Sequence, residues 1–236
     1  MSVITISNPS DLRILPAAPT TDEKPLYVCV AGQSGAGKST ILRTLTELVA
    51  ERRTNIVVLD EKALHPPYID QLFLAPSRYA FELQLQFMVN RVLFVKRWIA
   101  SGYSVLMERS HAEDPVFIRH LYALNHVTDD ERDAYMALWT SLAKRVPTPD
   151  LLVFLDVPVQ VSVQRLARAR PILDRPPFPD EAARRAWIAS WHYLYRERFK
   201  ELQSDPKRLR ILRFSYPVNT KRLCDTVTRA LDTPPK

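Results

Sequence analysis

The chain has 236 residues, a length that suits one domain, and a composition of 46% hydrophobic and 25% charged residues excludes a wholly disordered protein. The net charge of +7 suits an anionic ligand. The chain has no apolar run long enough for a membrane helix, so we expect no membrane partner. The two cysteines, Cys29 and Cys224, are too far apart in sequence to suggest a disulfide framework, and the first residues lack a secretory signal. We therefore expect a cytoplasmic protein.

Residues 1–24 are rich in proline and polar side chains, which predicts a flexible N-terminal arm, with a short docked strand at residues 12–15 as the alternative. The folded domain is expected at residues 25–236. It begins with a continuous apolar run at residues 26–31, which is typical of a strand buried on both faces of a parallel sheet. A glycine-rich loop follows, and apolar residues then recur with helical spacing as far as Val49.

Strand and helix patterns alternate along the rest of the chain. Further strands are predicted at residues 55–61, 103–110, 151–158 and 209–217. Helices are predicted at residues 78–102, 159–170, 181–202 and 220–232, with helical spacing also within residues 114–145. This order predicts an α/β fold with a five-stranded parallel sheet flanked by helices. Ligands bind such sheets at the carboxyl ends of the strands, so the residues that follow each strand are the candidates for a site.

The glycine-rich loop is the most specific motif in the chain. Of only four glycines, three fall within six residues, and residues 32–39 (GQSGAGKS) fit the pattern G-x-x-x-x-G-K-[ST] between a strand and a helix. Such a loop surrounds phosphates with backbone N–H groups, while Lys38 reaches the outer phosphates and the Ser39 hydroxyl binds Mg²⁺. We predict a P-loop NTPase/kinase fold that binds ATP or another nucleoside triphosphate with Mg²⁺. The expected nucleotide-binding residues of the loop are Gly32, Gln33, Ser34, Gly35, Ala36, Gly37, Lys38, Ser39 and Thr40.

The loop alone does not say how the nucleotide is used. A GTPase switch would need D-x-x-G and N-K-x-D motifs, and an ABC-type ATPase would need a second glycine-rich signature, none of which this sequence contains. A small-molecule kinase needs instead a base, an acceptor pocket and mobile arginines.

Residues with this chemistry follow the predicted strands. They are the pair Asp60-Glu61, the triplet Glu108-Arg109-Ser110, Gln84 and Arg91 on the long helix, Asp114, and the arginines Arg165, Arg168 and Arg170. Together with the phosphate loop they resemble the deoxyribonucleoside kinase family. The segments HPPYIDQLF (65–73) and PSRYAFELQ (76–84) resemble most its bacterial deoxyadenosine/deoxyguanosine branch, and the resemblance covers about residues 26–202.

The resemblance implies roles on the phosphoryl-transfer side. Glu61 matches the general base that accepts the proton of the sugar 5′-hydroxyl, and Arg109 matches the arginine that holds this oxygen and the base. Asp60 stays open as an alternative base. With Lys38, these two residues are the expected catalytic residues, and Glu108 matches the acid that acts on Mg²⁺ beside Ser39, mostly through water. Arg168 and Arg170 match a helical lid that closes on the phosphates, whereas Arg165 is one position away from the family's spacing.

The resemblance also implies an acceptor pocket. Gln84 and Arg91 are seven residues apart on one helix face, roughly 10 Å along the axis. In the family such residues bind the nucleobase, Asp114 matches the partner of Arg91, and Tyr68 and Phe117 are candidate stacking walls. The alternative is a polar stripe on an amphipathic helix. The sequence departs from the family at two places. Phe73 stands where the family usually has a tyrosine for the sugar 3′-hydroxyl, and the lid lacks the family's glycine and following acid, which Asp174 is a candidate to replace.

We therefore expect ATP-dependent phosphorylation of the 5′-hydroxyl of a deoxyribonucleoside, with a purine favoured. A nucleoside monophosphate kinase or another small-molecule P-loop kinase is the alternative, and a nucleotide-dependent regulatory ATPase is a more distant one. The expected partner is a small-molecule nucleoside rather than nucleic acid, and the resemblance implies a homodimer.

Overall fold

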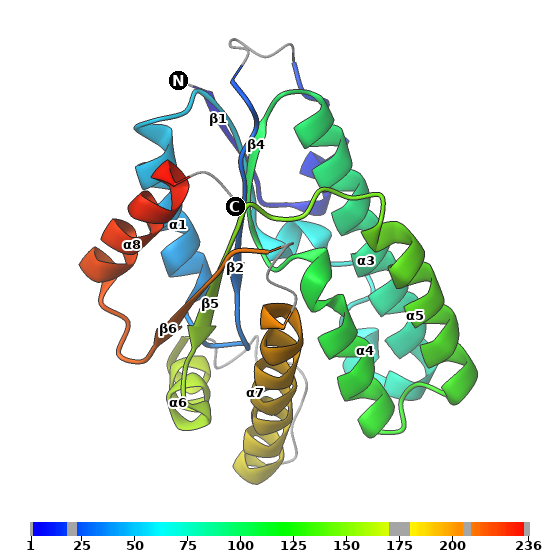
Figure 1. The fold of residues 1–236 in the computed structure, drawn as a ribbon. Coiled ribbons are helices and arrows are strands. Elements are labelled where there is room, and N and C mark those ends of the chain that lie inside the picture. Colours follow the sequence, from blue (N-terminus) through cyan, green and yellow to red (C-terminus); the bar gives the residue numbers. More distant parts are fainter. Residues whose placement is uncertain (1, 18–22, 170–179, 205–208, 234–236) are drawn as a thin grey trace.

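One parallel sheet forms the centre of the molecule (Figure 1). The structure is a computed structural model that describes residues 2–17, 23–169, 180–204 and 209–233. Within these residues the sheet has six strands in the order β1-β3-β4-β2-β5-β6, and every neighbouring pair is parallel. The strands are β1 (Ser2–Ile6), β2 (Tyr27–Ala31), β3 (Asn55–Leu59), β4 (Ser104–Glu108), β5 (Leu151–Asp156) and β6 (Ile211–Ser215). The predicted α/β class with a parallel sheet is confirmed.

The predicted count of five strands is wrong, because residues 2–6 of the expected arm form the edge strand β1. This strand pairs with β3 from Ser2 opposite Asn55 to Ile6 opposite Leu59. The alternative strand at residues 12–15 is also wrong, since Pro9–Arg13 form a 3-10 helix there. This segment is tied to the body by Arg97, which donates to the carbonyl of Leu12 at 2.7 Å. The division between arm and domain at residue 24 stays a prediction.

Helices cover both faces of the sheet. They are α1 (Lys38–Ala50), α2 (Gln71–Leu74), α3 (Pro76–Ala100), α4 (Asp114–Ala123), α5 (Asp129–Ala143), α6 (Val159–Ala169), α7 (Glu181–Gln203) and α8 (Thr220–Asp232). Figure 1 shows α1 and α8 on one side of the sheet, with α3, α4 and α5 on the other. No helix in the described parts of the chain has the length and apolar character that a membrane span requires.

Alternating side chains of each strand build two separate cores. On β2, Val28 and Val30 pack among residues of α1 and α8, whereas Tyr27 and Cys29 pack among residues of α3, α4 and α7. Successive side chains of a strand point to opposite faces, so a central strand must be apolar throughout, and all five residues of β2, β3 and β4 are buried.

The carboxyl ends of the central strands position the candidate site. The phosphate loop follows β2, Glu61 follows β3 and Arg109 follows β4, and parallel strands bring these three ends to one edge of the sheet. The predicted strand at residues 55–61 ends early, at Leu59, because Asp60 caps a short 3-10 helix over Glu61–Leu64. This turn sends the side chains of Asp60 and Glu61 in different directions.

Candidate active site

The phosphate loop depends on glycine at three positions. Gly32, Gly35 and Gly37 have φ angles of +141°, +76° and +97°, a backbone region that residues with a Cβ rarely adopt. Gly35 also packs against α6, where a Cβ would lie 2.6 Å from the carbonyl oxygen of Ser162. Gly37 is the N-cap of α1, so the loop leads directly into the positive end of a helix, which is a ready site for phosphate.

Side chains outside the loop hold it in this shape. Gln33 is fully buried, and its Nε2 donates to the carbonyl of Val157 at 2.5 Å and to Ser162 at 3.1 Å, so its side chain is engaged by the protein. Arg165 of α6 donates to the carbonyls of Gly35 and Ala36 at 3.3 and 3.0 Å. The arginine that departs from the family's spacing therefore contacts the loop directly. Arg168 is exposed in the last turn of α6, and Arg170 lies outside the described residues.

Lys38, Ser39 and Glu108 lie together at the start of α1. The Nζ of Lys38 is 3.9 Å from Oε2 of Glu108, and the hydroxyl of Ser39 lies near enough to this carboxylate to help lower its pKa. Lys38 and Glu108 are both buried, which lowers the pKa of the lysine and raises that of the glutamate. The two residues predicted to act on Mg²⁺ are thus neighbours, beside the cation predicted to reach the phosphates.

Glu61 and Arg109 form an ion pair beside this group. Arg109 Nε contacts Glu61 Oε1, and the Glu61 side chain keeps 23% of its surface exposed, so a ligand can reach it. Burial alone would raise the pKa of Glu61, but Arg109 and Lys38 outweigh it and lower the pKa to about 2. Asp60 is engaged elsewhere, since its Oδ1 accepts from the backbone N–H of Lys62 at 3.0 Å. The geometry therefore favours Glu61 over Asp60 as the acid that faces the site.

A second ion pair lies deeper, between α3 and α4. Arg91 Nη1 contacts Asp114 Oδ1, and both side chains are almost completely buried. Burial raises the pKa of Asp114 to about 6 against the opposing effect of Arg91, so the carboxylate is still ionised at pH 7. Arg91 Nε and Asp114 Oδ2 are buried without a hydrogen-bond partner among the described residues, and Gln84 is buried on the same helix as Arg91. Buried polar atoms of this kind suit a polar ligand.

The two pairs belong to one electrostatic group, because the charge of Arg91 also lowers the pKa of Glu61. The predicted aromatic walls differ in position. Phe117 packs under the Arg109 guanidinium, 4.9 Å from ring centre to the carbon of the guanidinium, whereas the hydroxyl of Tyr68 donates to Gln86 of α3 at 2.6 Å. Their contact with a nucleobase stays a prediction. The side chain of Phe73 and the whole of Asp174 lie outside the described parts of the structure.

A family model described as deoxynucleoside kinase matches residues 28–176, which is more than half of the chain and includes the phosphate loop, both ion pairs and α6. The chain belongs to the deoxynucleoside kinase family. The resemblance seen in the sequence is thereby confirmed.

The curated relatives of this deoxynucleoside kinase family member are distant in sequence, and the chain matches only part of their length. A deoxyadenosine kinase of Dictyostelium discoideum is 25% identical over 140 residues, which are 59% of this chain and 55% of the relative. A deoxyadenosine/deoxycytidine kinase of Bacillus subtilis (strain 168) is 25% identical over 142 residues, 59% of this chain and 63% of the relative. A probable thymidylate kinase of Archaeoglobus fulgidus is 26% identical over 149 residues, 61% of this chain and 70% of the relative.

Solved structures support the same fold. The structure of a deoxyadenosine kinase from M. mycoides with bound dATP superposes with a TM-score of 0.68 and 18% identity, covering 88% of this chain and 100% of that chain. The same kinase with bound dCTP gives a TM-score of 0.67 at 18% identity, covering 88% and 99%. The P-loop kinase fold is therefore confirmed.

Several residues at the site of this deoxynucleoside kinase family member escaped the sequence analysis. Tyr195 and Trp191 of α7 and the buried Glu113 lie around Arg109, and burial raises the pKa of Glu113 to about 7. Tyr195 and Trp191 are four residues apart in an amphipathic helix, a pattern that indicates only core packing. Glu113 is adjacent to Asp114 and forms a capping box with Ser110. The S-x-x-E pattern of this box is the sequence feature that could have identified Glu113 as a buried polar residue.

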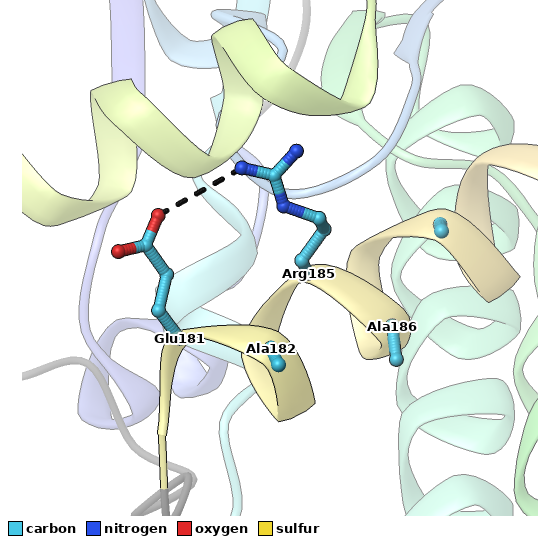
Figure 2. A pocket seen from close by; sticks show the side chains of 5 residues that line it. Glu181, Ala182, Arg185 and Ala186 are labelled. Carbon is cyan, nitrogen blue, oxygen red and sulfur yellow. Dashed lines mark ion pairs between the residues drawn. The ribbon is translucent and has the colours of Figure 1, made fainter.

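An open hollow of about 620 Å³ lies against the first turns of α7 (Figure 2). Its described lining is Glu181, Ala182, Arg185, Ala186 and Ala189. Figure 2 shows Glu181 and Arg185 pointing from α7 toward α6, where they pair with each other at 3.9 Å. None of the predicted site residues is in this lining.

Proposed function

We propose that the protein transfers the γ-phosphoryl group of ATP to the 5′-hydroxyl of a deoxyribonucleoside, with a purine favoured. The observation that carries the proposal is the Glu61–Arg109 ion pair at the strand ends, which interacts electrostatically both with Lys38 of the phosphate loop and with Arg91 of the buried Arg91–Asp114 pair. The names of two relatives, a deoxyadenosine kinase and a deoxyadenosine/deoxycytidine kinase, support a purine acceptor.

In this proposal the bond from the 5′-oxygen to the γ-phosphorus forms as the bond to the bridging β,γ-oxygen breaks, and the hydroxyl proton moves to Glu61. A carboxylate with a pKa of about 2 is a weak base, so its first task is to accept a hydrogen bond and orient the hydroxyl. This suits phosphoryl transfer, in which positioning and charge stabilisation dominate. Lys38 and Arg109 supply fixed positive charge beside the transferred group.

The residues at the start of α1 fit a magnesium ion. Ser39 and Glu108 would hold it, and when bound it neutralises phosphate charge. Mg²⁺ usually takes one or two carboxylates together with substrate phosphates and water, so a single buried glutamate beside a hydroxyl is sufficient. Within the residues that the structure describes, no group of three or more histidine, cysteine or acidic side chains is placed to hold a metal by itself.

The acceptor pocket favours an uncharged base. Asp114 neutralises Arg91, which leaves their remaining N–H and carboxylate oxygen, with the amide of Gln84, for donors and acceptors on a nucleobase edge. A nucleoside monophosphate kinase would need a further free cation for the acceptor phosphate. The probable thymidylate kinase among the relatives makes this the second candidate.

Turnover of a substrate panel tests the assignment. We expect ATP consumption with Mg²⁺ to rise with deoxyadenosine or deoxyguanosine and not with dAMP or TMP. Stimulation by the monophosphates alone would favour the second candidate. A rate of ATP hydrolysis that is the same with and without every acceptor in the panel would favour a regulatory ATPase.

Two neighbouring carboxylates provide the matched mutational test. Glu61→Gln should lower kcat by about 100-fold or more with little change in KM, because it removes the proton acceptor and keeps the shape. Asp60→Asn should stay within about threefold of the wild-type kcat, since Asp60 only caps the turn at Lys62. The reverse ranking would show that Glu61 is the wrong acid.

The homodimer and the cytoplasmic location are also proposals. Leu93 on the long helix α3 has 60% of its surface exposed, and a partner would cover such a residue. The free cysteines Cys29 and Cys224 suit a reducing compartment.

A further inference from the structure

The guanidinium group of Arg109 is enclosed by aromatic side chains from two helices. Phe117 of α4 lies 4.9 Å below it, and Trp191 and Tyr195 of α7 lie 5.6 and 5.9 Å away. Its Nη1 donates to the hydroxyl of Tyr195 and, at 3.3 Å, to the carbonyl of Gly32. Its rotation is therefore fixed by contacts on the side opposite Glu61.

The hydroxyl of Tyr195 lies in the buried interior beside Arg109. Tyr195 is completely buried, so its hydroxyl is remote from water. The hydroxyl accepts from Arg109, and it lies within the electrostatic range of the buried carboxylate of Glu113. Glu113 is itself fixed, because Oε1 accepts from the backbone N–H of Ser110 at 2.8 Å. Arg109 is therefore held directly by the Tyr195 hydroxyl, and the fixed carboxylate of Glu113 acts on this hydroxyl electrostatically.

Arg109 needs such support. Its φ of +62° is unusual for a residue with a side chain, and it occurs at the end of β4 where the catalytic ion pair begins. An arginine in this position must hold Glu61 with one edge and keep other N–H groups available for a reacting oxygen. A flexible guanidinium could instead form hydrogen bonds with another nearby carboxylate, since Glu108 and Glu113 both interact with it electrostatically.

We propose that Tyr195 is a positioning residue. Its hydroxyl fixes the guanidinium of Arg109, which in turn holds Glu61 in the correct position relative to the reacting 5′-oxygen. The inference rests on the proposed kinase activity. Tyr195 does not itself touch the transferred group, so its effect is expected in kcat for the acceptor and not in the affinity for ATP.

Tyr195→Phe removes the hydroxyl and keeps the ring. We expect kcat to fall by about 10- to 100-fold, because a small misplacement of catalytic groups has effects of this size, while KM for ATP stays within about twofold. The difference between the effects on kcat and on KM for ATP gives a readout of positioning. A general loss of packing beside the phosphate loop would raise KM for ATP as well, whereas a misplaced Arg109 lowers kcat alone.

Tyr193→Phe is the matched control, since Tyr193 lies on the same helix with 63% of its surface exposed. It should leave both kcat and KM for ATP unchanged. A folded Tyr195→Phe enzyme with wild-type kcat, or one whose KM for ATP rises as much as its kcat falls, would overturn the inference. Wild-type turnover is measured separately, so a wild type inactive on every nucleoside would refute the kinase assignment instead.

A second pair of variants keeps the test valid if Tyr195→Phe does not fold. Glu113→Ala removes the polar group that interacts with the Tyr195 hydroxyl, whereas Glu113→Gln retains a polar oxygen that can accept from the backbone N–H of Ser110. We expect kcat to fall in Glu113→Ala and to recover in Glu113→Gln to within about threefold of the wild type. Equal activity of the two variants would overturn the positioning role.

Discussion

Replacing Gly35 by alanine tests the geometry on which nucleotide binding depends. Gly35 has a φ of +76°, and an added Cβ would lie 2.6 Å from the carbonyl oxygen and 3.0 Å from the Cα of Ser162, and 3.1 Å from Leu166. Two of these three atoms belong to the backbone of α6, so no side-chain rotation relieves the overlap. The loop itself must therefore move away from α6.

The expected cost has two sources. The left-handed backbone costs an alanine about 1–2 kcal/mol, and overpacking a well-packed site costs about 1–3 kcal/mol. We expect Gly35→Ala to lower the free energy of unfolding by about 3 kcal/mol. Movement of the loop also breaks the contacts of Arg165 with the Gly35 and Ala36 carbonyls, so the phosphate site is lost with the stability.

Urea unfolding with and without Mg·ATP separates the two effects. A ligand at about 100 times its Kd stabilises the wild type by about 3 kcal/mol, and we expect less than about 1 kcal/mol in Gly35→Ala. Gly102→Ala is the matched control, because Gly102 has a similar φ of +82° at the end of α3, away from the loop. It should show the backbone cost and the full response to ATP. A Gly35→Ala variant that behaves like Gly102→Ala would refute the loop geometry.

Two further variants test buried polar groups. Asp114→Asn leaves the charge of Arg91 buried without its counterion, so the free energy of unfolding should fall by about 3–5 kcal/mol and the ranking of nucleosides by kcat/KM should change; a stable variant with the same ranking would make the pair structural. Burial lowers the pKa of His120 to about 3, so this group should cost the wild type about 2 kcal/mol of stability between pH 6.5 and 4.5, as the unfolded chain takes up a proton there. His120→Asn preserves an acceptor near Ser190, which lies 2.9 Å from His120 Nδ1, and should flatten this dependence in urea unfolding, whereas an unchanged slope would assign it to other groups.

Much of the fold was predictable because central strands and amphipathic helices have strong local patterns. The strand at Tyr27–Ala31 is apolar throughout since helices cover both its faces. The edge strand Ser2–Ile6 is not apolar and buried throughout. Over only five residues its side chains range from the exposed Val3 to the buried Ile6, so its local pattern is weak. Its pairing with β3 is a long-range contact that local patterns do not encode.

The site divides in the same way. Residues that follow strands are predictable, since the topology of a parallel sheet brings the strand ends together whatever lies between them. The resemblance favoured Glu61, but the residues alone left Asp60 open, because the direction of each side chain depends on a 3-10 turn in which Asp60 becomes the cap. Tyr195 was hidden for a different reason: a tyrosine on the buried face of a helix has the pattern of a core residue, and only the packing of α7 reveals that its hydroxyl contacts Arg109.

The charge balance of the described site limits how a nucleotide can enter it. Lys38, Arg91 and Arg109 face Glu61, Glu108, Glu113 and Asp114, so full ionisation leaves one excess negative charge in a buried cluster. Glu113 has a pKa of about 7 and is the acid whose protonation removes this excess near neutral pH. A triphosphate adds further negative charge to this cluster, so we expect Mg²⁺ and arginines outside the cluster to offset part of it. Arg165 already contacts the carbonyls of the phosphate loop, so α6 is the element from which we expect such an arginine to come.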